Sequence, residues 1–151
     1  HHLTRGLRIL HQCHSLQHHV FYSADDMVFR DQREFFYLLF PPLALPLLLL
    51  VDLPISLILG GLVSANIAWL FFASVPAYYF VYEWSHFAEH LSRNSWLGRR
   101  ALVGWIRQHH TRHHDWALME KGNFNVSFPL WDRVFGTMLP ETDRSAGPAD
   151  A

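Results

Sequence analysis

The 151-residue sequence is short of cysteine and of charge, and each shortage excludes a class of protein. Cys13 is the only cysteine, which excludes an internal disulfide framework and a thiolate-built zinc or iron–sulfur site. Charged residues make up 17% of the chain, whereas roughly a quarter is usual in soluble globular proteins. The 13 acidic and 12 basic residues nearly balance, so the composition does not indicate nucleic-acid binding. The length is about that of one domain.

Histidine is absent from residues 20–85, and the apolar residues gather in this gap. Asp52 and Glu83 are the only acidic or basic residues between positions 36 and 84. As one helix this segment would reach about 73 Å, whereas the hydrocarbon core of a bilayer is roughly 30 Å thick. One membrane span is therefore too few and three are too many. A very apolar soluble core is the alternative, and the scarcity of charge disfavours it.

A glycine pair divides this apolar segment. We predict a helical hairpin with limbs at about 37–59 and 62–83 and a turn at Gly60-Gly61. Membrane helices tolerate proline, so we expect the first limb to be kinked or partly re-entrant at Pro41, Pro42, Pro46 and Pro54. Asp52 is either functional inside the membrane or close to the far interface, and the proline two residues later favours the interface.

All twelve lysine and arginine residues flank the hairpin, four before it and eight after it. A hairpin returns both flanks to one side of the membrane, and the positive-inside rule makes that side cytoplasmic. We therefore predict an all-α, multi-pass membrane protein in which a cytosolic, histidine-rich helical cap holds a dimetal site. This domain covers residues 1–140, and we expect a disordered tail at 141–151 because few apolar residues remain there.

Eight of the twelve histidines form three groups with helical spacing. Residues three and four positions apart lie on the same face of a helix. The groups are His14, His18 and His19; His86 and His90; and His110, His113 and His114.

The first group is the least regular of the three. His14 and His18 share a helix face, while His19 is turned by about 100° from His18. His11 extends the stripe made by His14 and His18, so it would replace His19 if the segment is a regular helix.

Neutral imidazole is the commonest nitrogen ligand for zinc, iron, copper and nickel. A single histidine pair is weak evidence for a metal. Eight clustered histidines would repel one another once protonated below about pH 6.5, so the grouping favours a bound cation. Eight nitrogens exceed the needs of one tetrahedral ion and suit two metal ions.

The boxes H-x-x-x-H-H, H-x-x-x-H and H-x-x-H-H around a hydrophobic hairpin resemble those of the fatty acid hydroxylase/sterol desaturase superfamily. The residues Leu39-Phe40-Pro41-Pro42 are similar to the FPP segment with which that family enters the membrane. Asn123-Phe124 and the segment 131–137 resemble its closing N-F…W-D-R-x-F-G-T pattern. The resemblance covers about residues 11–140.

The resemblance implies an integral-membrane, oxygen-dependent di-iron enzyme that hydroxylates a fatty acyl or sterol-like lipid, with O₂ as co-substrate. Carried onto this chain, it implies that two iron ions, which zinc can replace in purified samples, are bound by His14, His18, His19, His86, His90, His110, His113 and His114. The family has an earlier box, H-x(3-4)-H, so we expect the natural N-terminus to be longer. His1 or His2 is either the last member of that box or a tag or linker residue.

Ligating imidazoles normally donate their second N–H to a carboxylate or carbonyl. The acids close to the boxes are Glu83, Glu89, Asp115 and Asp132. We favour Asp115 and Asp132 as such partners, with Asn123 as a further candidate. The alternative for both acids is surface charge or a structural pair with a neighbouring arginine.

The sequence has no G-x-G-x-x-G fingerprint and no C-x-x-C-H haem attachment site. Electrons must then come from a separate donor of the cytochrome b5, ferredoxin or reductase type. The FPP and N-F…W-D-R segments favour a hydroxylase over a desaturase of the same superfamily. A non-catalytic metal-binding or transport protein is the alternative from another class, and it predicts polar residues along the spans.

Overall fold

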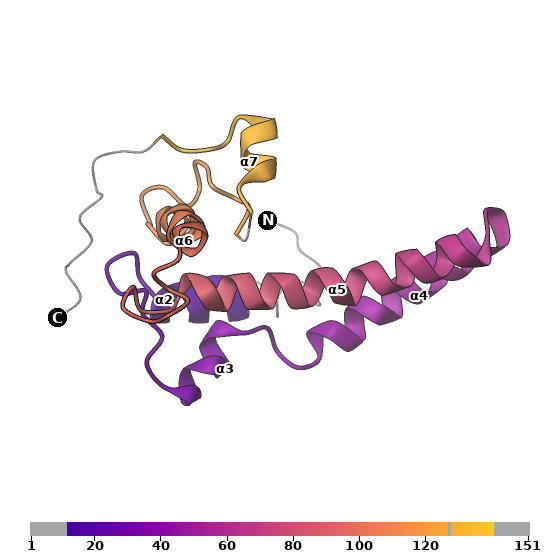
Figure 1. Cartoon of the computed structure of the whole chain (residues 1–151), viewed down its shortest axis with the longest axis horizontal. Helices are drawn as coiled ribbons and strands as arrows, with labels where there is room; N and C mark the ends of the chain where they lie inside the picture. Colours follow the sequence, from indigo (N-terminus) through magenta and orange to yellow (C-terminus); the bar gives the residue numbers. More distant parts are fainter. Residues whose placement is uncertain (1–11, 127, 141–151) are drawn as a thin grey trace. The chain divides into compact units, whose positions relative to one another are not determined.

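A computed structural model describes residues 12–126 and 128–140 of the chain. Within these residues the regular elements are all helical, as predicted, with one isolated β-bridge between Ser23 and Asp26. The elements are π-helix η1 (Gln12–His18), α2 (His19–Phe21), 3₁₀ helix η2 (Gln32–Glu34), α3 (Phe35–Leu38), α4 (Ala44–Leu62), α5 (Ala65–Glu89), α6 (Ala101–His113) and α7 (Leu130–Phe135) (Figure 1). His1, His2, His11 and the predicted tail at 141–151 lie outside the described residues.

The chain divides into two compact units. The hairpin unit is Phe40–Trp84, and the histidine unit contains the residues before and after it. Helix α5 contributes to both, because its last turn from Ser85 onward belongs to the histidine unit.

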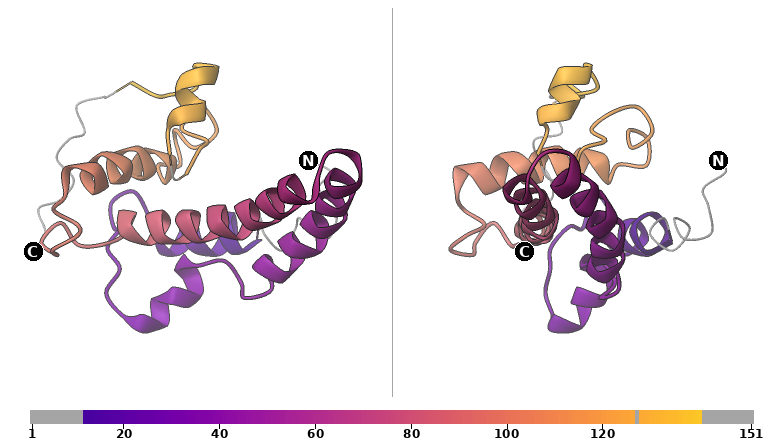
Figure 2. Two further views of the ribbon diagram at one scale, coloured as in Figure 1. Left: turned by 45° about the vertical axis from the view of Figure 1, so that its right-hand side comes forward. Right: turned by 90° about the vertical axis from the view of Figure 1, so that its right-hand side faces the viewer.

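Helices α4 and α5 form the hairpin unit and lie side by side in opposite directions (Figures 1 and 2). The turn between them is at Val63 and Ser64, so the predicted turn at Gly60-Gly61 is wrong. The Ser64 hydroxyl accepts a hydrogen bond from the N–H of Ile67 at 3.3 Å and so caps the start of α5. This cap places the reversal after the glycine pair, which stays helical.

Gly60 has a packing role instead. A Cβ atom added to Gly60 would lie 3.3 Å from the Cβ of Ala68, whereas one added to Gly61 would meet nothing within 4 Å. Small residues let membrane helices approach closely. Gly60 therefore allows α4 to approach the first turn of α5.

Both limbs of the hairpin have shifted ends relative to the prediction. The first limb begins at Ala44 rather than at residue 37, since Leu39 is extended and Pro41-Pro42 follows it. Proline lacks an N–H and disfavours helix in the residue before it. The second limb continues beyond residue 83 to Glu89.

Asp52 lies in the middle of α4 and is only 3% exposed, and its expected position close to the far interface stays a prediction. The hydroxyl of Ser56, one turn later, donates to its Oδ1 at 3.2 Å. The hydrogen bond within the helix partly satisfies the acid where it is buried.

The hairpin unit exposes its apolar residues. Leu50 and Leu57 are each 68% exposed and Trp69 is 71% exposed. Both α4 and α5 are long and apolar enough to cross a membrane, judged by length and composition. This surface is favourable in lipid and unfavourable in water.

The histidine unit has the opposite character, because its interior is largely polar. A small hydrophobic cluster contains Tyr22, Met27 and Leu38, with Phe29 and Phe87 packed against it. The largest fully buried side chains that the structure describes are otherwise polar: His18, His19, His86, His90, His110, His114, Glu89, Asn123 and Asp132. Buried polar groups need partners, so the site is the centre of this unit.

Candidate metal centre

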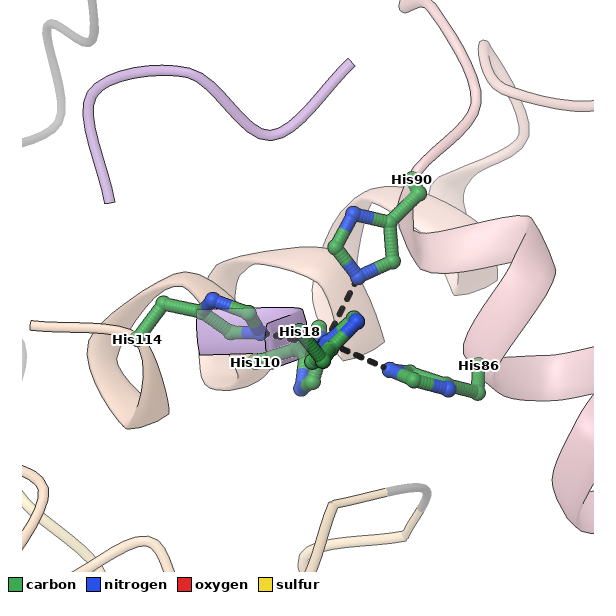
Figure 3. A group of neighbouring side chains, drawn as sticks. All are labelled: His18, His86, His90, His110 and His114. Carbon is green, nitrogen blue, oxygen red and sulfur yellow. Dashed lines mark hydrogen bonds between the residues drawn. The ribbon is translucent and has the colours of Figure 1, made fainter. Parts of the chain in front are cut away.

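Five buried imidazoles converge at one point of the histidine unit (Figure 3). They come from the end of η1, the last turn of α5 and the residue that follows it, and the C-terminal end of α6. Their candidate ligand atoms all lie within 4.8 Å of one another, and we call them the five-histidine group: His18, His86, His90, His110 and His114.

The Nε2 atoms of this group form a series of short contacts. His18 Nε2 lies 3.0 Å from the Nε2 atoms of His86 and His114. His110 Nε2 lies 3.0 Å from those of His90 and His114. The five rings therefore present the same nitrogen towards a common centre.

Main-chain carbonyls determine which ring nitrogen carries the proton. In three of the five rings Nδ1 contacts a backbone oxygen: His18 with Tyr37 at 3.0 Å, His90 with Met27 at 2.7 Å, and His114 with Tyr22. A carbonyl only accepts, so Nδ1 must donate. A neutral imidazole has one N–H. The Nε2 atom of each of these rings is therefore unprotonated and carries a free lone pair.

Two such lone pairs face each other. His18 Nε2 and His114 Nε2 are 3.0 Å apart, and neither has a proton to donate to the other. A shared cation removes the repulsion, because two nitrogens each about 2.1 Å from one ion and at right angles are about 3.0 Å apart. The donor set therefore fits a metal ion.

Burial keeps these imidazoles neutral. It lowers the pKa of His90 to about 3, and it lowers the pKa of His110 and His114 well below 6.5, where neighbouring imidazoles add to the effect. Burial also strongly lowers the pKa of His18. Neutral imidazole is the form that binds metal.

A second cluster, which we call the three-histidine group, contains His14, His19 and His113. The Nε2 atoms of His14 and His19 are 3.3 Å apart. Nδ1 of His19 has no hydrogen-bond partner among the described residues, and His113 interacts with the backbone of Asn123. Burial lowers the pKa of His19 to about 3. The convergence of one nitrogen from each ring fits a ligand set for a second ion.

The first sequence box is divided between the groups because η1 is a π-helix. In a π-helix the hydrogen bond links residues five apart, so His19 lies one turn above His14. The predicted turn of about 100° between His18 and His19 agrees with their places in different groups, but it did not indicate that His19 would pair with His14. The condition under which His11 would replace His19, a regular helix, is not met in residues 12–18.

The third box is divided in the same way. His110 and His114, four residues apart, belong to the five-histidine group, and His113 belongs to the other. The ring of His19 stacks on that of His114 with 4.1 Å between centroids, so the groups are in contact. The structure thus brings together all eight histidines predicted as ligands, as a set of five beside a set of three.

Asp132 and Asn123 contact α6 through His109, a histidine outside the boxes. Asp132 accepts hydrogen bonds from three groups, the N–H groups of Phe124 and Asn125 at 2.9 and 2.8 Å and the Thr137 hydroxyl at 2.6 Å. Its Oδ2 lies 3.3 Å from His109 Nε2.

The side-chain amide of Asn123 donates to the carbonyl of His109 at 3.2 Å and accepts from the N–H of Leu139 at 2.8 Å. These contacts attach the closing segment to α6. Asp115 accepts from the N–H of Ala117 at 2.9 Å. That Asp115, Asn123 and Asp132 orient metal ligands stays a prediction.

The sequence prediction did not select Glu89 or the carbonyls that orient the rings. Glu89 is fully buried, and its Oε2 lies 3.5 Å from His110 Nδ1. Its position three residues after His86 places it on the ligand face of the helix, which is a usable sequence signal. Backbone carbonyls have no such signal, because every residue carries one.

The fold and the site define a helical membrane protein with a histidine-rich site. The model of the fatty acid hydroxylase family matches residues 1–137, and the chain belongs to this family. Comparisons with curated proteins and with solved structures find no match. Family membership and the two apolar helices support association with a membrane.

Proposed function

We propose that the protein is a membrane-bound, oxygen-dependent di-iron oxygenase that hydroxylates a fatty acyl or sterol-like lipid. The observation that carries the proposal is the arrangement of eight histidines, most of them buried, in two adjoining groups, with opposed lone pairs in the larger one. Membership of the fatty acid hydroxylase family supports the reaction class.

Each of the two histidine groups would hold one iron ion, and O₂ would be the co-substrate. Bound iron supplies the oxidation of an unreactive C–H bond, which no side chain accomplishes unaided. The carbonyls of Tyr22, Met27 and Tyr37 keep three rings in the tautomer that binds a cation. Burial of the rings excludes water and keeps protons from competing for the ligand nitrogens.

The hairpin anchors the enzyme with both flanks in the cytoplasm. Its exposed apolar surface supports access to a substrate dissolved in the bilayer. Electrons would come from a cytochrome b5-, ferredoxin- or reductase-type donor, because oxygen activation at iron consumes electrons.

The test uses the full chain in lipid nanodiscs, loaded with iron and supplied with a chemical reductant, lipid and isotopically labelled O₂. Wild-type protein should consume oxygen and form a lipid product that contains one labelled oxygen atom. His86→Ala and His113→Ala, one variant from each group, should lose product formation by about a hundredfold or more. The matched control is Glu120→Gln, an exposed site that should retain activity.

The products distinguish the alternatives. A product that has lost two hydrogens and gained no oxygen identifies a desaturase. Iron binding without oxygen consumption in the presence of lipid and reductant identifies a non-catalytic metal protein and contradicts the proposal.

A further inference from the structure

Glu89 is a buried acid in the last turn of α5, directly before His90. It is 0% exposed, and among the described residues neither carboxylate oxygen accepts a hydrogen bond. Burial raises the pKa of Glu89 well above 4.5, while the positive charge of Arg107 lowers it. The carboxylate is therefore ionised only where a positive charge or a hydrogen-bond donor compensates its burial.

A ring of the five-histidine group lies beside this carboxylate as a candidate donor. Glu89 Oε2 lies 3.5 Å from His110 Nδ1, while His110 Nε2 faces the Nε2 atoms of His90 and His114 at 3.0 Å. The imidazole of His110 therefore lies between the carboxylate and the point where the ligand nitrogens converge. The carboxylate itself is not among those converging atoms.

This pairing differs from that of the other rings with known partners. His18, His90 and His114 each contact a neutral backbone carbonyl through Nδ1. His110 alone of these four faces a group that can carry a full negative charge. A carboxylate behind an imidazole orients it and increases its basicity as a ligand.

We propose that Glu89 is a positioning residue that accepts the Nδ1–H of His110 and places a negative charge beside five otherwise neutral ligands. The charge strengthens binding of a cation at the five-histidine group and stabilises its more oxidised state. The inference rests on the proposed function to the extent that a redox-active ion occupies this group.

A purely structural role for Glu89 is the competing explanation. Arg107 binds the adjoining main chain, because its Nε and Nη2 donate to the carbonyls of Glu89 and Gly98, each at 3.1 Å. If Glu89 only packs beside this arginine, its replacement lowers the stability of the protein and leaves the ion's affinity and reduction potential unchanged.

The experiment compares three variants of the iron-loaded full chain in nanodiscs. Glu89→Gln keeps the size of the side chain and removes its charge. Glu89→Asp keeps the charge but shortens the side chain by one methylene, which moves the carboxylate away from His110. Glu83→Gln is the matched control, because it makes the same substitution at a partly buried acid of α5 whose Oε1 accepts from the N–H of Phe40. The measurements are iron affinity by chelator competition and reduction potential by spectroelectrochemistry.

We expect Glu89→Gln to weaken iron binding by about 10- to 100-fold and to raise the reduction potential. Glu89→Asp should shift both quantities less and in the same direction, and Glu83→Gln should match the wild type. If Glu89→Gln does not fold, the shift in Glu89→Asp still decides the question. Wild-type affinity and potential in the Glu89 variants, with or without reduced stability, overturn the inference.

Failure of the proposed function gives a different result. In that case the wild-type protein itself forms no lipid product. Zinc affinity of the same variants then tests Glu89 separately, since the five ligands and their orientation are the same for either ion.

Discussion

At the scale of single residues, most histidines of the site are removed from water, held neutral and oriented as ligands. The rings are buried, their pKa values are lowered, and three are oriented by carbonyls. Such a set is poorly stable when empty, because lone pairs face one another without a proton. We therefore expect ion binding to be coupled to folding in this unit.

The division into five and three ligands predicts the metal content of single variants. His113→Ala leaves two described ligands in the three-histidine group, so we expect it to lose one of two ions per chain. His110→Ala removes the ring that contacts both His90 and His114, so we expect loss of the other ion. Metal analysis of purified protein measures the content. Loss of both ions or of neither in His113→Ala contradicts two separable sites.

The lowered pKa values also predict acid sensitivity of the metal-free chain. Burial lowers the pKa of His19 and His90 from 6.5 to about 3, so between these values the unfolded chain binds protons that the folded chain does not. The free energy of unfolding should therefore be highest above pH 6.5 and decrease below it, by up to about 1.4 kcal/mol per pH unit for each such histidine. Thermal unfolding in detergent across this range measures the trend. A midpoint independent of pH would show that the rings are not buried and neutral.

At the scale of elements, the helix type decides which side chains meet. A regular helix over residues 12–18 would align His14 with His18, whereas the π-helix aligns His14 with His19. In α6 the ordinary spacing of four pairs His110 with His114. The conformation of the closing segment depends on Asp132, which accepts hydrogen bonds from two N–H groups and one hydroxyl of that segment. The same carboxylate lies beside His109 of α6.

Helix packing in the hairpin predicts a contrast between two adjacent glycines. Gly60→Leu places a side chain against Ala68 and should separate α4 from α5, lowering the thermal stability of the protein in detergent. Gly61→Leu is the matched control, because the added side chain points into open space and should be tolerated. Equal effects of the two substitutions would show that α4 does not approach α5 closely at Gly60.

At the scale of the whole molecule, the two units have opposite distributions of polarity. The hairpin unit carries its leucine and aromatic side chains outside, and the histidine unit carries histidine and acid inside. Lipid would stabilise the first arrangement, and a bound cation would stabilise the second. Each unit thus requires an environment that water alone does not supply.

The proposed topology predicts the accessibility of single cysteines in a Cys13→Ser background. Gln32→Cys and Glu120→Cys lie before and after the hairpin, and Ser64→Cys lies in its turn. An impermeant maleimide should label the first two from the cytoplasmic side of vesicles and the third from the opposite side. Labelling of positions 32 and 120 from opposite sides would exclude the hairpin topology.

Much of the site could be predicted from residue order because its signals are local. The apolar segment, the flanking arginines and the spacing of the histidines predicted the helical class, the two long apolar helices and all eight members of the two groups. The closing N-F…W-D-R pattern was recognisable for the same reason. The turn at Val63-Ser64 was missed, since a glycine pair suits a turn in water and close helix packing in a membrane equally well.

The sequence alone thus determined which residues bear the chemistry and which segment seeks lipid, because both follow from composition and helical period. Tertiary structure decided how the histidines divide between two groups, which ring nitrogen faces inward, and that Glu89 rather than Asp115 faces His110. These features depend on contacts between residues far apart in sequence and on backbone carbonyls such as those of Tyr22, Met27 and Tyr37. A carbonyl is common to all residues, so only the folded chain shows which ones orient a ligand.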